Sequence, residues 1–357
     1  MVSVIHPDGS IANHNLLVFI ALALAILTGC GAREEYLGFR GETMGTNYTI
    51  SYRDDPGCEI QHGDIDSLLI AVNNTMSTYQ LDSELSLLNQ KKTPGEYPIS
   101  RELLFVLRAA ERVWYQTNGA FDVTIGPLIN LWGFGPSKVA NEPTTSEQDN
   151  IKSRIGMVNL MLGTDSLVKK EHDMYVDLSA IAKGYAVDQV VEAIEAMGHN
   201  NYMVEIGGEV FAKGTNPKDG PWRIGIETPS AHAPGIFEVV VLSSQAMATS
   251  GDYRNFYEEN GQRFSHTIDP KTGRSIKHTL ASVSVLSSSC AKADALAKLS
   301  WDVIPVESWQ VIGPFGGDHP TPWEQPLVDM NKDFGIKLTG QPDTNQLLTG
   351  YQGKSVT

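Results

Sequence analysis

The stretch VDLSAIAKGYAVD, residues 176–188, is the segment around which this chain is organised. A β-prone run leads into it, and a helix follows with apolar residues at spacings of three and four and Asp188 on the polar face. Ser179 is the predicted N-cap, and Gly198 is predicted to end the helix. Such a strand–turn–helix corner favours an anion at its free backbone N–H groups, and Lys183 adds positive charge there. An ordinary strand–helix connection with a solvent-exposed lysine explains this segment equally well.

The composition is that of a globular protein. The chain has 357 residues, of which 41% are hydrophobic and 19% charged. This length allows one large domain or two closely joined ones. The formal net charge of −15, with no basic block, argues against nucleic acid as a partner.

The N-terminal region has the features of an export signal. Residues 16–27 (LLVFIALALAIL) are typical of a signal-peptide core, being too short to span a bilayer comfortably. The sequence LTGC that ends at Cys30 resembles a bacterial lipobox, in which the cysteine is lipidated after cleavage. We therefore expect a lipoprotein signal peptide over residues 1–29 and a tether over 30–40. The protein would be periplasmic and lipid-anchored to a bacterial membrane, although residues 1–15 lack the usual Lys or Arg.

Alternating and helical patterns predict an α+β fold with mostly antiparallel sheets flanked by helices. The expected strands are 46–52, 202–210 (broken by a glycine pair), 222–227, 237–242, 263–269 and 281–286. The expected helices are 65–76, a short capped one near 82–86, 101–117, the helix after 179 and 291–298.

Aromatic residues alternate with glycines over residues 119–135, GAFDVTIGPLINLWGFG. This pattern makes a poor regular element, because glycine weakens helices and strands alike. It could form a wall for a flat ring, since glycine allows close approach and Trp and Phe offer their faces. A packed aromatic turn explains the composition equally well.

Three polar positions complete the candidate chemistry. His266 shares a strand face with Phe264 and Ile268, so it is either a core histidine or a base. Asp294 and Lys298 lie one turn apart, which is either a surface pair worth about 0.3–0.5 kcal/mol or part of a site. With Asp177, Asp294 could hold a hard cation through oxygen. These residues predict Mg²⁺-assisted chemistry on a nucleotide-like pyrophosphate.

Nine motifs follow one another along residues 40–297: MGT (44–46), MSTY (76–79), SELS (83–86), GAFDVTIGPLINLWGFG (119–135), DLSAIAKGYAVD (177–188), VEIGGEV (204–210), SGDYRNF (250–256), SHTIDPKTG (265–273) and ADALA (293–297). Together they resemble the ApbE family of bacterial FAD:protein FMN transferases, which are often periplasmic lipoproteins.

The resemblance implies Mg²⁺-dependent transfer of FMN from FAD to a threonine hydroxyl of an acceptor flavoprotein, with release of AMP. Acceptors in the family are subunits of respiratory redox complexes and other extracytoplasmic flavoproteins. By motif, Ala180, through its carbonyl, and Asp294 would bind Mg²⁺, and His266 would deprotonate the acceptor. The residues that would contact FAD are Met44, Tyr79, Ala120, Phe121, Asp122, Asp177, Lys183 and Ile268.

One position departs from the family pattern, which runs Asp-Ala-Leu-Ala-Thr with the threonine as a metal ligand. Here that position is Lys298, and an ammonium group has no lone pair to offer a metal. Two alternatives therefore stay open: an FAD-binding lipoprotein without transferase activity, and an FAD pyrophosphatase that gives FMN and AMP. We expect the transferase domain over residues 41–303. A divergent tail over 304–357 faintly resembles the start of an accessory module.

Overall fold

The computed structural model describes residues 35–54, 59–134, 142–228, 235–251, 256–259, 262–265, 267–276, 282–299 and 337–339. The predicted signal peptide, Cys30 and His266 lie outside these residues.

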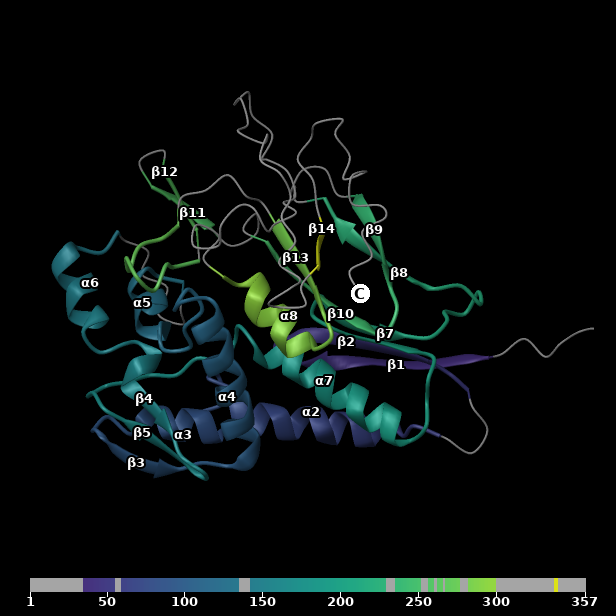
Figure 1. The fold of residues 1–357 in the computed structure, drawn as a ribbon, viewed down its shortest axis with the longest axis horizontal. Helices are drawn as coiled ribbons and strands as arrows, with labels where there is room; N and C mark the ends of the chain where they lie inside the picture. Colours follow the sequence, from purple (N-terminus) through teal and green to yellow (C-terminus); the bar gives the residue numbers. More distant parts are fainter. Residues whose placement is uncertain are drawn as a thin grey trace, which may run out of the picture.

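A seven-stranded antiparallel sheet forms the centre of the molecule, in the order β1-β2-β6-β7-β10-β13-β14 (Figure 1). Its strands are β1 (Tyr36–Thr43), β2 (Thr46–Arg53), β6 (Tyr202–Ile206), β7 (Glu209–Lys213), β10 (Gln245–Gly251), β13 (Ser282–Ser287) and β14 (Lys337–Thr339). Tyr48, Ile50 and Tyr52 of β2 alternate into the core and are almost fully buried. This period of two explains why one face of the sheet carries the main core.

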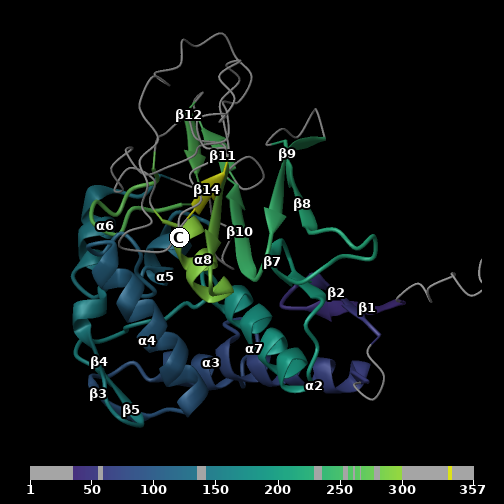
Figure 2. The same cartoon turned by 45° about the vertical axis from the view of Figure 1, so that its right-hand side comes forward.

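Helices cover that face, while a hairpin covers part of the other. The helices are α2 (His62–Met76), α7 (Ala182–Ala196) and α8 (Cys290–Ala297), and in Figure 1 α2 and α7 run below the sheet. The hairpin β8 (Trp222–Glu227) and β9 (Ile236–Leu242) packs through Trp222, Val240 and Leu242 on β7 and β10 (Figure 2).

A second group of elements lies beside the sheet, on the left of Figure 1. It contains a small sheet in the order β3-β5-β4 with four helices and a short 3₁₀ helix. The elements are α3 (Glu84–Gln90), β3 (Gly95–Pro98), α4 (Arg101–Gln116), α5 (Gly126–Leu131), α6 (Thr145–Lys152), η1 (Met157–Asn159), β4 (Leu160–Leu162) and β5 (Ser166–Lys169). The hairpin of β11 (Phe256–Glu259) and β12 (Gln262–Ser265) lies above α5 and α6.

The predicted fold class is confirmed, and three details differ. A helix, α5, occupies part of the aromatic–glycine stretch, because Pro127 sits in its first turn where a missing N–H costs nothing. The sheet begins at Tyr36, inside the predicted tether, and β14 lies in the predicted tail. In the described part of the chain, no helix has the length and apolar character needed to cross a membrane.

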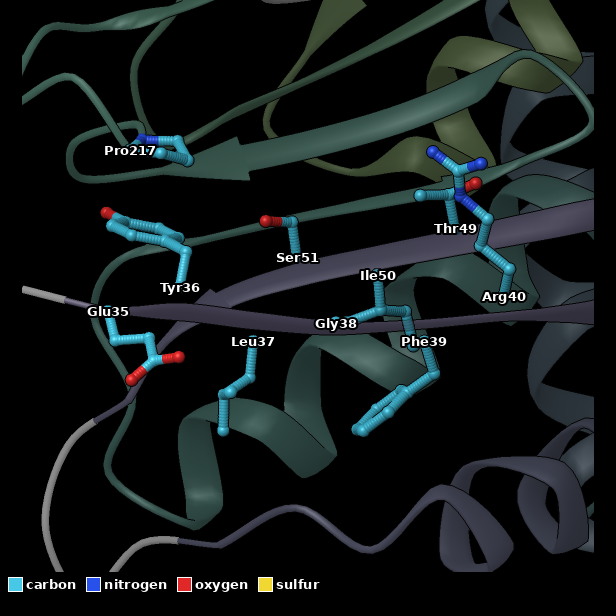
Figure 3. A pocket seen from close by; sticks show the side chains of 10 residues that line it. All are labelled: Glu35, Tyr36, Leu37, Gly38, Phe39, Arg40, Thr49, Ile50, Ser51 and Pro217. Atoms are coloured by element: carbon cyan, nitrogen blue, oxygen red, sulfur yellow. The ribbon is translucent and has the colours of Figure 1, made fainter.

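A cavity of about 730 Å³ lies along the first half of β1 (Figure 3). Leu37 and Phe39 point to the helix side of this strand, whereas Tyr36 lies on the other side with Ser51 of β2. None of the predicted site residues lines this cavity. The predicted FAD residue Met44 lies directly after the other end of β1.

Candidate functional site

Two hairpin turns lie side by side at that end of the sheet. The β1–β2 turn has positive φ angles at Met44 (51°) and Gly45 (71°), and the β6–β7 turn has them at Gly207 (59°) and Gly208 (98°). The backbone N–H of Gly207 donates to the carbonyl of Asn47 at 3.1 Å. A Cβ at Gly208 would meet nothing within 4 Å, so this turn leaves open space above its backbone. The predicted FAD residue Met44 thus lies beside a glycine pair that lets a ligand approach closely.

Lys183, in the first turn of α7, reaches this glycine turn. Its Nζ donates to the Oε2 of Glu209 at 2.5 Å and lies 3.4 Å from the carbonyl oxygen of Gly207. Glu209 is only 1% exposed. Burial alone would lower the pKa of Lys183, but the carboxylates of Glu209 and Asp294 more than offset it and raise the pKa. Lys183 is therefore a charged group at the start of α7 that is ion-paired with Glu209.

The α7 helix crosses α8 at very short range. A Cβ at Gly184 would lie 2.3 Å from the carbonyl oxygen of Cys290, so glycine is needed at the crossing. The N–H of Gly184 donates to the Oδ2 of Asp294 at 3.1 Å. Farther along α7, Asp188 accepts hydrogen bonds from the N–H groups of Cys290 and Ala291 at the start of α8. This crossing places the predicted metal ligand Asp294 beside the first turn of α7.

Asp294 is a fully buried carboxylate with an open oxygen. It is 0% exposed, and its Oδ1 has no hydrogen-bond partner. The Nζ of Lys298 lies 4.0 Å from that oxygen, beyond hydrogen-bond distance. Burial raises the pKa of Asp294 to about 7, Glu209 adds to the rise, and Lys298 and Lys183 oppose it. Asp294 and Lys298 therefore do not form a surface ion pair, so the first of the two interpretations of this pair is wrong.

Asp177 lies in the extended segment that precedes α7. Its N–H donates to the carbonyl of Val123 at 2.7 Å, and its Oδ1 accepts from the N–H of Ser179 at 2.8 Å. A Cβ at Gly126 would lie 2.7 Å from the ring of Tyr175. The predicted FAD segments around residues 122 and 177 are therefore in direct backbone contact.

The remaining predicted FAD residues differ sharply in exposure. Tyr79 is 81% exposed, in the loop between α2 and α3, whereas Ala120, Phe121 and Ile268 are buried. The carboxylate of Asp122 faces inward: Oδ1 accepts from the N–H and hydroxyl of Thr124, and Oδ2 from the N–H of Met157. Asp122 therefore holds its own loop in shape. Ala180 lies in the turn just before α7.

The aromatic–glycine stretch and the 264–276 segment pack together. The indole N–H of Trp132 donates to the carbonyl of Gly273 at 2.9 Å, and Trp132 packs with Phe264 and Ile268 in a small core. Trp132 is buried, so it serves as a packing residue, in agreement with the second of the two interpretations. His266 lies outside the described residues, but this core shows that its neighbours are anchored to α5.

Sequence reasoning misplaced one cap and missed two acidic residues. The predicted N-cap Ser179 is wrong: α7 begins at Ala182, and its N-cap, Ile181, makes no side-chain cap bond. The cause is an extra turn, in which the N–H groups of Ile181 and Ala182 both donate to Leu178. Asp188, expected on the polar face, caps α8 instead, and Glu209 received no role although its motif was recognised. The sequence signal for Glu209 is its place directly after the Gly207–Gly208 pair. Its burial, which makes it a candidate site residue, is visible only in the structure.

The implied Mg²⁺ fits this site in part. Among the described residues, no group of three or more His, Cys, Asp or Glu side chains is placed to hold a metal ion. The open, buried Oδ1 of Asp294 suits a metal ion that takes few protein carboxylates plus phosphate oxygens. Lys298 does not fit, because its ammonium group lies 4.0 Å from that same oxygen and has no lone pair to donate.

The charged Lys183, two turns that contain glycine and the buried carboxylate of Asp294 lie together at this end of the sheet, an arrangement that suits a phosphate-bearing ligand. Comparison with known proteins makes this specific: the profile described as the ApbE family matches residues 44–310. The chain belongs to the ApbE family.

Individual relatives agree with this assignment. A Vibrio cholerae protein named FAD:protein FMN transferase is 45% identical over 287 residues, which cover 79% of this chain and 86% of that protein. The Escherichia coli K12 protein of the same name is 36% identical over 284 residues, covering 77% and 78%.

Solved structures show the same fold. The flavin transferase ApbE of Vibrio cholerae superposes with a TM-score of 0.68 at 44% identity, covering 74% of this chain and 86% of that one. The apo form of the flavinyl transferase ApbE of Pseudomonas stutzeri gives a TM-score of 0.68 at 35% identity, covering 74% and 84%. The predicted family and fold are confirmed, and the predicted activity agrees with the names of these relatives.

Proposed function

We propose that this protein transfers FMN from FAD to a threonine hydroxyl of an acceptor flavoprotein and releases AMP, with Mg²⁺ as cofactor. The relatives named FAD:protein FMN transferase support the reaction. The observation that carries it here is the position of Lys183: its Nζ lies 3.4 Å from the carbonyl oxygen of Gly207 and pairs with Glu209, and the next residue, Gly184, binds the buried carboxylate of Asp294. A pyrophosphate bound there would meet the ammonium group of Lys183, backbone that allows close approach and a candidate metal ligand.

The proposed reaction is one displacement at phosphorus. The acceptor hydroxyl oxygen forms a bond to the phosphorus on the FMN side, and the bond from that phosphorus to the bridging oxygen breaks. AMP leaves with the bridging oxygen, and His266 takes the hydroxyl proton. Lys183 orients the pyrophosphate and stabilises its charge. Mg²⁺, when bound, would neutralise part of that charge; Asp294 and the carbonyl of Ala180 would hold it.

The decisive experiment incubates the purified protein with FAD, Mg²⁺ and a threonine-bearing acceptor. We expect covalent flavin fluorescence on the acceptor in a denaturing gel, together with AMP in equal amount. AMP without a labelled acceptor would identify a pyrophosphatase, and tightly held FAD without AMP would identify a binding lipoprotein. Transfer that is unchanged in His266→Ala would show that another group is the base.

A matched pair of lysine variants tests the site itself. Lys183→Met should lower the transfer rate about 100-fold, because it removes the cation aimed at the pyrophosphate. Lys213→Met removes a lysine that is also paired with a glutamate, Glu195, at 2.7 Å, but on the far end of β7. It should leave the rate within twofold of wild type.

We further propose a periplasmic location, with a lipid on Cys30 as the anchor, and acceptors that are subunits of respiratory redox complexes or other extracytoplasmic flavoproteins. The apolar run and lipobox of the N-terminal region support the anchor. Cys30→Ala should move the protein from the membrane fraction to the soluble fraction of cells. Protein that stays in the membrane fraction would rule out this anchor.

A further inference from the structure

The candidate metal ligand, Asp294, and the three charged side chains near it balance one another in formal charge. Two carboxylates, Asp294 and Glu209, are buried, and two ammonium groups, Lys183 and Lys298, lie against them. Lys183 pairs with Glu209 at 2.5 Å, while Lys298 lies 4.0 Å from Asp294. With both carboxylates ionised and without Lys298, the cluster would carry a formal charge of about −1, the condition that favours an added cation. With it, the formal charge is about zero.

A metal ion and the Lys298 ammonium group would compete for the same oxygen. The Oδ1 of Asp294 is the buried oxygen without a hydrogen-bond partner, since Oδ2 accepts from Gly184. Mg²⁺ bound to Oδ1 at its usual distance would lie within about 6 Å of the Lys298 Nζ as now placed. Two cations that close repel strongly in a buried site. The side chain of Lys298 is 27% exposed, so it has solvent on one side and can withdraw.

We infer that Lys298 is the resident cation of this site, so that the protein without FAD binds divalent cations weakly. The ammonium group of Lys298 takes the place that a metal ion would otherwise hold beside Asp294. This inference rests on the proposed function for the identity of the site, but it concerns the ligand-free protein. In this chain, the metal would then enter mainly together with the pyrophosphate, whose negative charge shifts the balance of the cluster.

Binding of Mn²⁺ to the full-length protein without FAD or acceptor tests the inference, with free Mn²⁺ followed by electron paramagnetic resonance. Lys298→Met removes the charge and keeps much of the apolar stem; Lys298→Thr also supplies a hydroxyl. We expect both variants to bind Mn²⁺ at least tenfold more tightly than wild type. The control Lys292→Met removes a lysine from the same helix and should stay within twofold of wild type.

Equal affinity of wild type and Lys298→Met would overturn the inference. A gain in Lys298→Thr alone would overturn it too, because a new hydroxyl ligand rather than lost charge would then be responsible. If the variants do not fold, the wild-type protein still tests the inference. Its thermal unfolding midpoint should not change with millimolar Mg²⁺, and a clear rise would contradict the inference that Lys298 occupies the cation position. None of these readouts uses flavin transfer, so an inactive transferase could pass this test and an active one could fail it.

Discussion

Two regions of the molecule hold a lysine side chain against buried polar groups, one lysine fully buried and the other 23% exposed, and they do so in opposite ways. Lys169 on β5 is 1% exposed, and its Nζ donates to the carbonyls of Leu88, Lys91 and Met174 at 2.7, 3.1 and 3.0 Å. Lys183 on α7 instead meets the carboxylate of Glu209. Burial lowers the pKa of Lys169 to about 8, because neutral carbonyls only partly replace water. The pKa of Lys183 is raised, because carboxylates face it.

The difference separates a structural site from one with binding capacity. An ammonium group has three donors, and Lys169 uses all three on backbone carbonyls, so it offers nothing to a ligand. The cluster around Asp294 keeps one buried oxygen open. The Lys169 site also supports the segment that leads to the Asp294 cluster. Lys169 donates to the carbonyl of Met174, and Asn89 binds both the N–H and the carbonyl of Val176, just before Asp177.

Removing the charge of Asp294 should have the largest effect. Asp294→Asn keeps an oxygen that can accept from Gly184 but loses the carboxylate, so the FMN transfer rate should fall 100- to 1000-fold, about 3–4 kcal/mol. The control is Asp149→Asn, whose Oδ1 also lies 4.0 Å from a lysine, Lys152, but on the surface. Its rate should equal that of wild type. Equal losses in the two variants would mean that burial and the open oxygen are irrelevant.

Moving the two helices apart should have the next largest effect. In Gly184→Ala the new methyl group would collide with the Cys290 carbonyl, so the free energy of unfolding should drop by about 2.5 kcal/mol in urea titrations. Gly63→Ala in α2 is the control: nothing lies within 4 Å of its Cβ position. It should stabilise the protein by about 0.5 kcal/mol, because alanine restricts the unfolded chain more than glycine does. A neutral Gly184→Ala would contradict the close α7–α8 crossing.

The closed lysine site should respond to pH as well as to mutation. Lys169→Met leaves three carbonyls without a donor and should cost about 2 kcal/mol of unfolding free energy at pH 7. Because the folded pKa of about 8 lies below the ordinary 10.5, the unfolded chain binds more protons between these values. The contribution of Lys169 to stability therefore rises with pH across this window.

Urea titrations at pH 7.5 and 9.5 would measure this rise. The gap in unfolding free energy between wild type and Lys169→Met should widen at the higher pH. Because the gap is a difference between two proteins, contributions from other groups that titrate in this pH range, among them the tyrosines, cancel out. A gap that narrows would show that the three carbonyls hold the ammonium group charged despite its burial.

The sequence predicted the repeating elements better than the contacts between them. Periodicity placed α4, β2 and most of α7 because a period of two or 3.6 reports which face is buried. Motif resemblance located Lys183 and Asp294, but no pattern could show that Lys169 meets three carbonyls, two of them about 80 residues away. Such contacts depend on tertiary packing, which a local pattern does not contain. Ser179 failed as a cap for a local reason, the extra turn at Leu178.

Two serine variants give the smallest expected effect and test the revised start of α7. Ser289 is the N-cap of α8: its Oγ accepts from the N–H of Lys292 and donates to Asp188 at 2.8 Å. Ser289→Ala should lower the unfolding free energy by about 1 kcal/mol, because the cap is lost while Asp188 still accepts from two backbone N–H groups. Ser179→Ala removes an exposed hydroxyl that caps no helix and should change stability by less than about 0.5 kcal/mol. A larger loss in Ser179→Ala than in Ser289→Ala would restore Ser179 as the cap and move the start of α7 toward Asp177.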